Sequence, residues 1–407
     1  MRLRRLCVIV LGAALVASRG LRAQQPGTNV PALPLPPAPA ADHVTVQLRG
    51  IEPRYALPQP LLLPTPRAVK ALYVNAWAFG SPKLRTLVRL ADSTEINAFV
   101  IDVKDDTGCL LYPSAVKTAQ DVGATQCVRA RDARARLDTL RAHGIYAIAR
   151  IVVAKDPLVA EHKVAWSVRD AAGELWRDRI GSAWVDAYND SVWIYAAQLA
   201  EEAVHMGFAE VQFDYVRFPD EPHERLVTAL FPGKRPGENF RAGVRRNVQM
   251  LKRRLAPLGV PVTFDVFGLT VSAEGDLGIG QVWEDFTGVA DVILPMVYPS
   301  HYYPGAYGYS WPNGQPYQIV RHALREALER TTGVAAPRIR PYLQAFTLGR
   351  RKPRYTPFEI REEIRAAEEL GIDSWVLWNP RSVYQRDSLR PYRAGVHFAQ
   401  AVNGGVE

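Results

Sequence analysis

Short apolar runs with the two-residue alternation of a β-strand are separated along this chain by longer segments with helical spacing. The clearest alternation begins at Glu210, where polar residues at 210, 212 and 214 are interleaved with apolar residues at 211, 213 and 215. Polar side chains that share one face of a buried strand need partners. Eight runs have strand character, at 71–77, 98–104, 145–152, 210–217, 262–267, 292–298, 339–346 and 374–378.

Helical patterns lie between these strands, and several of them end at a glycine. Gly144, Gly207, Gly259 and Gly371 each follow a helical segment at the position where a left-handed residue commonly ends a helix. Strands that alternate with helices predict an α/β fold, and eight of them predict a (β/α)8 TIM barrel. The predicted helices are 84–91, 131–143, 191–206, 240–255, 275–286, 319–330 and 357–370.

The N-terminal residues have the features of a secretory signal peptide. A basic start at 1–5 precedes an apolar run at 6–16, which is too short to span a membrane. We predict export to the periplasm or the extracellular space and no transmembrane segment after cleavage; a retained N-terminal anchor is the alternative. The predicted organisation is a signal peptide at 1–23, a Pro/Ala-rich linker at 24–66, the barrel at 67–395 and a tail at 396–407.

Cleavage of the signal peptide would remove Cys7 and leave Cys109 and Cys127. An even number of cysteines in an oxidising compartment favours a disulfide bond, and two free thiols are the alternative. Two cysteines without nearby histidines do not have the ligands of a zinc site. The histidines show no metal-binding spacing and no Gly-rich phosphate loop follows a strand, so we predict no metal and no cofactor.

The formal net charge of +9 raises the question of nucleic-acid binding. The densest basic stretches are 241–254 and 350–354. The first has an apolar stripe at helical spacing, so its arginines form the solvated face of an amphipathic helix. We therefore predict no nucleic-acid partner. Nothing in the composition indicates an oligomeric state.

Polar or aromatic residues close the predicted strands, whereas the opposite ends begin with plain apolar residues. In a parallel barrel the C-terminal strand ends share one mouth, which is where this fold places its chemistry. Carboxylates and amides suit sugar hydroxyls, and aromatic rings suit the apolar faces of sugars. The residues at these ends are Asp102, Lys104, Arg150, Asp214, Arg217, Asp265, Tyr298, Gln344, Trp378 and Asn379.

Four motifs lie in these strands and in the loops after them, at 96–108, 210–219, 294–299 and 375–379. Together they resemble the bacterial "putative glycosyl hydrolase" barrel family, formerly a domain of unknown function (DUF4015). The resemblance covers about residues 67–393. It implies a TIM-type barrel similar to retaining glycosidases, in which a fourth-strand aspartate is the usual nucleophile, and Asp214 matches that position. Related barrels often carry a glutamate acid at the end of strand five, where this chain has no glutamate.

Glycoside hydrolysis needs two carboxyl groups, about 5 Å apart for retention and further apart for inversion. Neighbouring strands lie about 4.8 Å apart, so Asp214 and Asp265 have the shorter spacing if both point inward at similar height. We predict Asp214 as nucleophile and Asp265 as acid/base, with Asp102 as an inverting base or a ligand of a sugar hydroxyl. The cations would hold the carboxylates ionised or bind acidic sugars. The predicted substrate-binding residues are Lys104, Arg150, Arg217, Tyr298, Gln344, Trp378 and Asn379.

Each of these residues also has a purely structural interpretation. Asp214 and Arg217 would then form a structural ion pair, and Asp102 would belong to a buried charge network with Lys104 or Arg150. Asp265 would be a satisfied interior carboxylate. Residues 105–108 would form a turn rather than a calcium loop, and Tyr298 and Trp378 would be core residues.

The sequence as a whole predicts an exported O-glycosyl hydrolase with a carbohydrate substrate, either a polysaccharide or a cell-envelope glycan. The alternative is a barrel that binds glycans without cleaving them, as a scaffold or pseudo-enzyme. The motifs leave open the sugar and its anomer, endo or exo action, and retention or inversion.

Overall fold

The computed structural model describes residues 62–333, 338–349 and 353–392. The predicted signal peptide, most of the predicted linker and the predicted tail lie outside these residues. Within the described ranges, no helix is long and apolar enough to cross a membrane.

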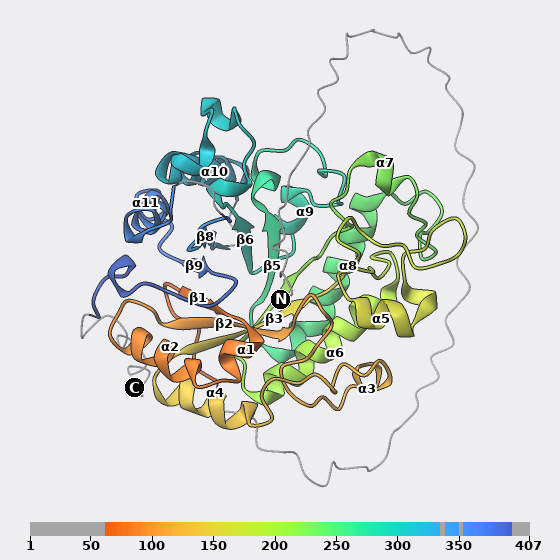
Figure 1. Cartoon of the computed structure of the whole chain (residues 1–407), viewed down its shortest axis with the longest axis horizontal. Coiled ribbons are helices and arrows are strands. Elements are labelled where there is room, and N and C mark those ends of the chain that lie inside the picture. The colour runs from red at the N-terminus through yellow and green to blue at the C-terminus, as the bar shows by residue number, and fades with distance from the viewer. Residues whose placement is uncertain (1–61, 334–337, 350–352, 393–407) are drawn as a thin grey trace, which may run out of the picture. The chain divides into compact units, whose positions relative to one another are not determined.

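A closed parallel sheet forms the centre of the fold and confirms the predicted (β/α)8 barrel (Figure 1). The sheet closes because β5 pairs with β6 as well as with β4. Where one strand over 339–346 is predicted, Pro341 has no N–H to donate and divides it into β7 and β8, which share one barrel position beside β6. The strands are β1 (Lys70–Val74), β2 (Ala98–Lys104), β3 (Tyr146–Val152), β4 (Glu210–Asp214), β5 (Val262–Phe267), β6 (Val292–Met296), β7 (Arg338–Ile339), β8 (Tyr342–Gln344) and β9 (Trp375–Trp378).

Among the strands that end earlier than predicted, β1 and β4 each stop for a clear local reason. Strand β1 stops at Val74 because Asn75 caps a short helix, where its side chain accepts a hydrogen bond from the N–H of Ala78 at 2.8 Å. Strand β4 stops at Asp214 because Tyr215 has a left-handed backbone, with φ at 53°, which a strand cannot contain. Both interruptions fall at the C-terminal ends of the strands.

Helices surround the barrel, and the glycines predicted to end four of them have left-handed backbones. The φ angles are 67° at Gly144, 119° at Gly207, 66° at Gly259 and 79° at Gly371. The helices of the described residues are α1 (Ala76–Phe79), α2 (Lys83–Asp92), α3 (Lys117–Asp121), α4 (Ala133–Ala142), α5 (Pro157–His162), α6 (Asp190–Met206), α7 (His223–Leu226), α8 (Phe240–Leu255), α9 (Trp283–Thr287), α10 (Pro316–Arg330) and α11 (Pro357–Glu368).

The helix predicted at 275–286 is wrong for most of its length. Only its end is helical, within the five-residue α9. Gly278 and Gly280 both have positive φ, at 68° and 86°, so the preceding segment turns instead of continuing a helix.

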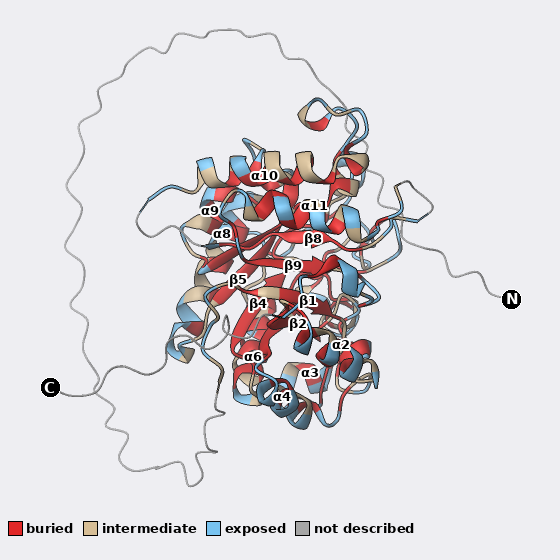
Figure 2. Cartoon of the chain, turned by 90° about the vertical axis from the view of Figure 1, so that its left-hand side faces the viewer, coloured by how far each residue is buried: buried red, intermediate tan, exposed pale blue. Residues whose placement is uncertain are grey.

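The core has two parts. One fills the space between strands and helices, and the other fills the barrel interior. Figure 2 shows the strands buried, while the outer faces of helices such as α4 and α10 are exposed. Leu62 and Leu63, which the sequence places in the linker, pack against the interior cluster. The folded domain therefore begins before residue 67.

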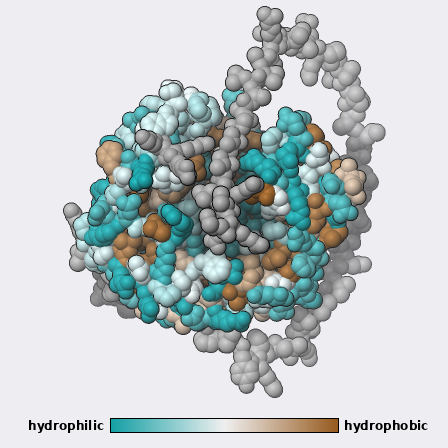
Figure 3. Space-filling view, in the orientation of Figure 1, coloured by the Kyte–Doolittle hydropathy of each residue, from teal (hydrophilic) through white to brown (hydrophobic). Residues whose placement is uncertain are grey.

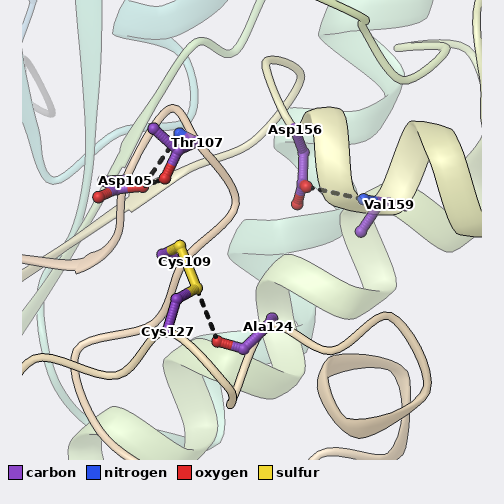
Figure 4. The surroundings of a disulfide bond; sticks show 7 residues. All are labelled: Asp105, Thr107, Cys109, Ala124, Cys127, Asp156 and Val159. Atoms are coloured by element: carbon purple, nitrogen blue, oxygen red, sulfur yellow. Dashed lines mark hydrogen bonds between the residues drawn. A yellow bond between two sulfur atoms is a disulfide. The ribbon is translucent and has the colours of Figure 1, made fainter.

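The predicted disulfide bond between Cys109 and Cys127 is present in the loop after β2, with the two Cα atoms 5.6 Å apart (Figure 4). The turn predicted just before it is also present. The side chain of Asp105 accepts a hydrogen bond from the N–H of Thr107 at 3.0 Å, and Gly108 has a positive φ of 83°.

Removal of this bridge should destabilise the protein by about 3 kcal/mol, because a cross-link over a separation of 18 residues restricts the unfolded chain. Denaturant unfolding of Cys109→Ser/Cys127→Ser against the wild type measures this loss. Thiol titration of the mature, unreduced and denatured wild type should find no free cysteine. Two reactive thiols would contradict the bridge.

Candidate active site

Four neighbouring strands carry the charged side chains of the barrel mouth. Asp102 lies on β2, Arg150 on β3, Asp214 on β4 and Asp265 on β5. All four side chains are largely buried. We call this the charged half of the mouth.

The strand register sets Asp214 and Asp265 at the same level. Gln212 on β4 pairs with Thr263 on β5, and each aspartate lies two residues further along its strand. Parallel neighbours at the same level present their side chains to the same face of the sheet. Both carboxyl groups therefore face the barrel axis from adjacent strands.

The guanidinium of Arg150 lies among the three carboxyl groups. Its Nη1 donates to Oδ1 of Asp102 at 2.5 Å, and its Nη2 donates to Oδ2 of Asp214. Its Nε lies 3.7 Å from Oδ2 of Asp265. Asp214 therefore pairs with Arg150 on the neighbouring strand β3. The alternative ion pair of Asp214 with Arg217 is not formed.

Asp214 is the most accessible of the three carboxyl groups, with 6% of its surface exposed against 3% for Asp102 and 1% for Asp265. Its Oδ1 accepts a hydrogen bond from the N–H of Tyr215 at 2.5 Å. Left-handed backbone in a non-glycine residue is strained and is found disproportionately at functional sites. The turn at Tyr215 thus places a backbone donor on the carboxylate.

Asp265 is buried with only part of its hydrogen-bonding capacity used. Its Oδ2 accepts from Nε2 of Gln212 at 3.0 Å, while its Oδ1 has no hydrogen-bond partner among the described residues. Burial, and then the neighbouring charge of Asp214, raise the pKa of Asp265 well above its usual range. Asp265 therefore keeps its proton under conditions in which an ordinary carboxyl group is ionised.

Asp102 is held from two sides. Its Oδ2 accepts from the hydroxyl of Tyr73 at 2.5 Å, and Arg150 binds its other oxygen. Burial raises the pKa of Asp102 to about 6, and Arg150 and the Tyr73 hydroxyl oppose that rise.

The other half of the mouth, formed by β6, β8, β9 and β1, is aromatic. Trp378 at the end of β9 contacts the ring of Tyr298 at a centroid distance of 5.3 Å, with the planes 27° apart. Phe346 lies 5.1 Å from Trp378, and Tyr73 lies 6.0 Å from it. We call these four rings the aromatic wall. Carboxyl groups on one half of the mouth and aromatic rings on the other suit a sugar, which has polar edges and apolar faces.

Two predicted cationic residues are engaged away from the three carboxyl groups. The Nζ of Lys104 donates to Asp156 at 2.6 Å, after an irregularity in the pairing of β2 with β3. Arg217 donates to Asp220 at 3.0 Å, and three aromatic rings surround its guanidinium. Both side chains are buried in these contacts.

Two predicted amide residues brace the loops of the mouth. Oε1 of Gln344 accepts from the N–H of Ser300 at 3.1 Å. Nδ2 of Asn379 donates to the carbonyl of Ala345 at 2.6 Å. Each side chain therefore fixes a loop beside the site.

Sequence reasoning assigned no site role to Tyr73, Gln212 or Tyr342. Gln212 bridges the two halves of the mouth, because its Nε2 donates to the hydroxyl of Tyr342 at 2.6 Å as well as to Asp265. The alternation of β4 already placed Gln212 in one row with Asp214. The inward position of Tyr73 in β1 follows from the same two-residue period.

Comparison with known proteins bears on the fold and the family of the chain. No protein of curated function matches the chain. A hypothetical protein from Ruminiclostridium thermocellum is 34% identical over 48% of this chain and 97% of its own, with a TM-score of 0.44. The glycoside hydrolase domain of PgaB (BpsB) from Bordetella bronchiseptica is 13% identical over 77% of this chain and 95% of its own, with a TM-score of 0.52, and shows likeness of fold.

The glycoside hydrolase domain of PelA from Pseudomonas aeruginosa is 14% identical over 79% of this chain and 97% of its own, with a TM-score of 0.44. The family described as "Putative glycosyl hydrolase domain" (DUF4015) matches residues 71–384, from β1 to beyond β9. Because the match spans the whole barrel, the chain belongs to this glycosyl hydrolase family.

Proposed function

We propose that this protein is an exported glycoside hydrolase that cleaves a polysaccharide or a cell-envelope glycan through Asp214 and Asp265. The contrast between these two carboxyl groups carries the proposal. Arg150 and the N–H of Tyr215 compensate the charge of Asp214, whereas the buried Asp265 keeps its proton. Two neighbouring carboxyl groups in such different environments have the properties of a nucleophile and an acid.

In the first step the Asp214 carboxylate attacks the anomeric carbon. The bond from that carbon to the leaving oxygen breaks as Asp265 transfers its proton to this oxygen. In the second step the ionised Asp265 takes a proton from water, whose oxygen attacks the same carbon and releases Asp214. Strands about 4.8 Å apart support the separation of about 5 Å that this retaining route needs.

The remaining polar groups of the mouth orient this pair. Tyr73 binds Asp102, Asp102 binds Arg150, and Arg150 binds Asp214, so we assign Asp102 and Arg150 as positioning residues. The aromatic wall around Trp378 would receive the apolar face of the sugar.

The disulfide bond supports export, because such bonds persist in oxidising compartments. The basic start and apolar run at the N-terminus support the same location. A substrate outside the cytoplasm would then be a secreted polysaccharide or a glycan of the envelope.

Incubation of the mature protein with neutral, amino-sugar and acidic polysaccharides and with peptidoglycan tests the proposal. We expect new reducing ends from at least one of them, because the two carboxyl groups provide both halves of the hydrolysis. Release of reducing ends is measured over time against heat-inactivated protein. Binding to a glycan without any release would instead support a non-catalytic glycan-binding barrel.

A further inference from the structure

Two tryptophans of the mouth side of the barrel are exposed. Trp77 is 65% exposed and lies in α1, directly after β1. Trp311 is 51% exposed and lies in the connection from β6 to α10. These strands bound the aromatic half, which runs from β6 through β8 and β9 to β1. The strands β8 and β9 of the aromatic half therefore lie between the two strands whose following segments carry the exposed rings.

The ring of Trp77 is supported on one side. The guanidinium carbon of Arg129 lies 3.9 Å from its ring centroid. Arg129 follows the disulfide-closed loop, and its backbone comes so close to Gly80 that a Cβ there would lie 2.1 Å from the Arg129 carbonyl oxygen. Helix α1, which carries Trp77, is fixed to the loop after β9, because the N–H of its N-cap residue Asn75 donates to the Ser382 hydroxyl at 3.0 Å.

The ring of Trp311 is also supported on one side. It lies against Gly314, where a Cβ would come within 2.3 Å of the indole ring. The turn between them is anchored to the barrel, because Nε2 of Gln344 donates to Oδ1 of Asn313 at 3.4 Å. The same Gln344 binds the N–H of Ser300, so one strand-end amide fixes both ends of this loop.

From these two supported and exposed rings we infer that Trp77 and Trp311 are stacking platforms for sugar units of a polymeric glycan, on either side of the catalytic centre. The inference rests on the proposed function and extends it from one sugar to a chain that crosses the mouth. A rigid aromatic ring with a free face binds the apolar face of a pyranose. A protein partner would need a broad contiguous apolar surface.

The surroundings of the two rings fit a hydrated polymer. Arg129 borders Trp77, and Ser310 and Asn313 are neighbours of Trp311 in the chain. In the part of the surface that Figure 3 shows in colour, apolar residues form small patches that hydrophilic residues separate. A glycan that stacks on each ring and meets the polar groups beside it matches these neighbours.

Trp77→Ala and Trp311→Ala should each lower kcat/KM for the cleaved polysaccharide about tenfold, which corresponds to about 1.4 kcal/mol. Hydrolysis of a short aryl glycoside, which reaches only the centre, should change less than about twofold. Gly314→Ala keeps the indole but displaces it, so it should reproduce the Trp311→Ala defect. Tyr392→Ala is the control, because its N–H binds Ser93 at the end of α2, on the opposite side of the barrel.

Retardation in polysaccharide-containing gels provides a second readout that does not need turnover. Wild-type cleavage of a polymer with unchanged kinetics in both tryptophan variants would overturn this inference and leave the proposed function standing. Retardation without cleavage would overturn the proposed function; its loss in the variants would still support the platforms, and its persistence would overturn them. A wild type that neither cleaves nor is retarded overturns both.

Discussion

Asp214→Asn should lower the turnover of a natural glycan by on the order of a thousandfold or more. An amide cannot form the glycosyl ester, so the barrier of the first step rises by at least about 4 kcal/mol. Asparagine keeps the shape of the side chain, but its single oxygen can take the place of only one of the two Asp214 oxygens, which accept separately from Arg150 and from the N–H of Tyr215. Initial rates and melting temperatures of variant and wild type measure both effects.

Asp265→Asn is the matched comparison on the neighbouring strand. It should impair natural glycans strongly but aryl glycosides with good leaving groups much less, since an activated leaving oxygen needs little protonation. Near-wild-type turnover of Asp214→Asn would reject its role as nucleophile. Loss of activity together with a collapsed melting temperature would favour a structural role for Asp214.

Arg150→Met should be among the most destabilising single changes in the domain, at roughly 3–5 kcal/mol near pH 8. The side chain is only 11% exposed, and its removal leaves the buried Asp102 and Asp214 without their shared cation. Denaturant unfolding of the variant and the wild type at about pH 5 and pH 8 measures the loss.

The loss should be smaller at the lower pH. Asp102 has a folded pKa of about 6, raised above the usual value of 3.8, so protonation favours the folded state at low pH and this stabilisation is lost as pH rises through about 6. Arg150 lowers that pKa, so without it the pKa rises further and the carboxyl group is neutral at pH 5. A deficit that does not depend on pH would contradict this account.

Arg340→Met is the control for the loss of a buried arginine. Arg340 binds Glu210 at 2.6 Å at the start of β4, and both side chains are at most 2% exposed. Its removal should also destabilise the barrel. Arg340 contacts none of the three aspartates. The relative rates of Arg340→Met on natural glycans and on aryl glycosides with good leaving groups should therefore stay as in the wild type.

The regular parts of the fold follow closely from the alternation of residues. The predicted strands at 98–104 and 262–267 and the predicted helix at 240–255 have the bounds of β2, β5 and α8. These segments have uninterrupted periods, so local pattern and tertiary packing agree. The prediction for strand seven failed at Pro341, where a single residue without an N–H outweighs the surrounding apolar pattern.

The candidate site shows where such reasoning stops. Alternation places Asp102, Asp214 and Asp265 at one mouth, since strand direction and period suffice for that. It does not identify ionic partners, because Arg150 reaches Asp214 from a different strand, whereas Arg217 is nearer in sequence. The irregular pairing between Asp102 and Lys104 and the left-handed Tyr215 redirect the chain at the C-terminal ends of these strands. Such local departures depend on tertiary contacts that the two-residue period does not encode.

The leucines that precede β1 give the boundary between linker and domain a physical meaning. Leu62 and Leu63 pack against the interior cluster of the barrel, and Thr65 lies 3.2 Å from the hydroxyl of Tyr146. A recombinant fragment that starts at residue 67 would lack these two leucines, and the apolar side chains of the interior cluster that they cover would be exposed to water. Leu62 and Leu63 are therefore subject to the same packing constraint as the core residues, although they precede the first strand.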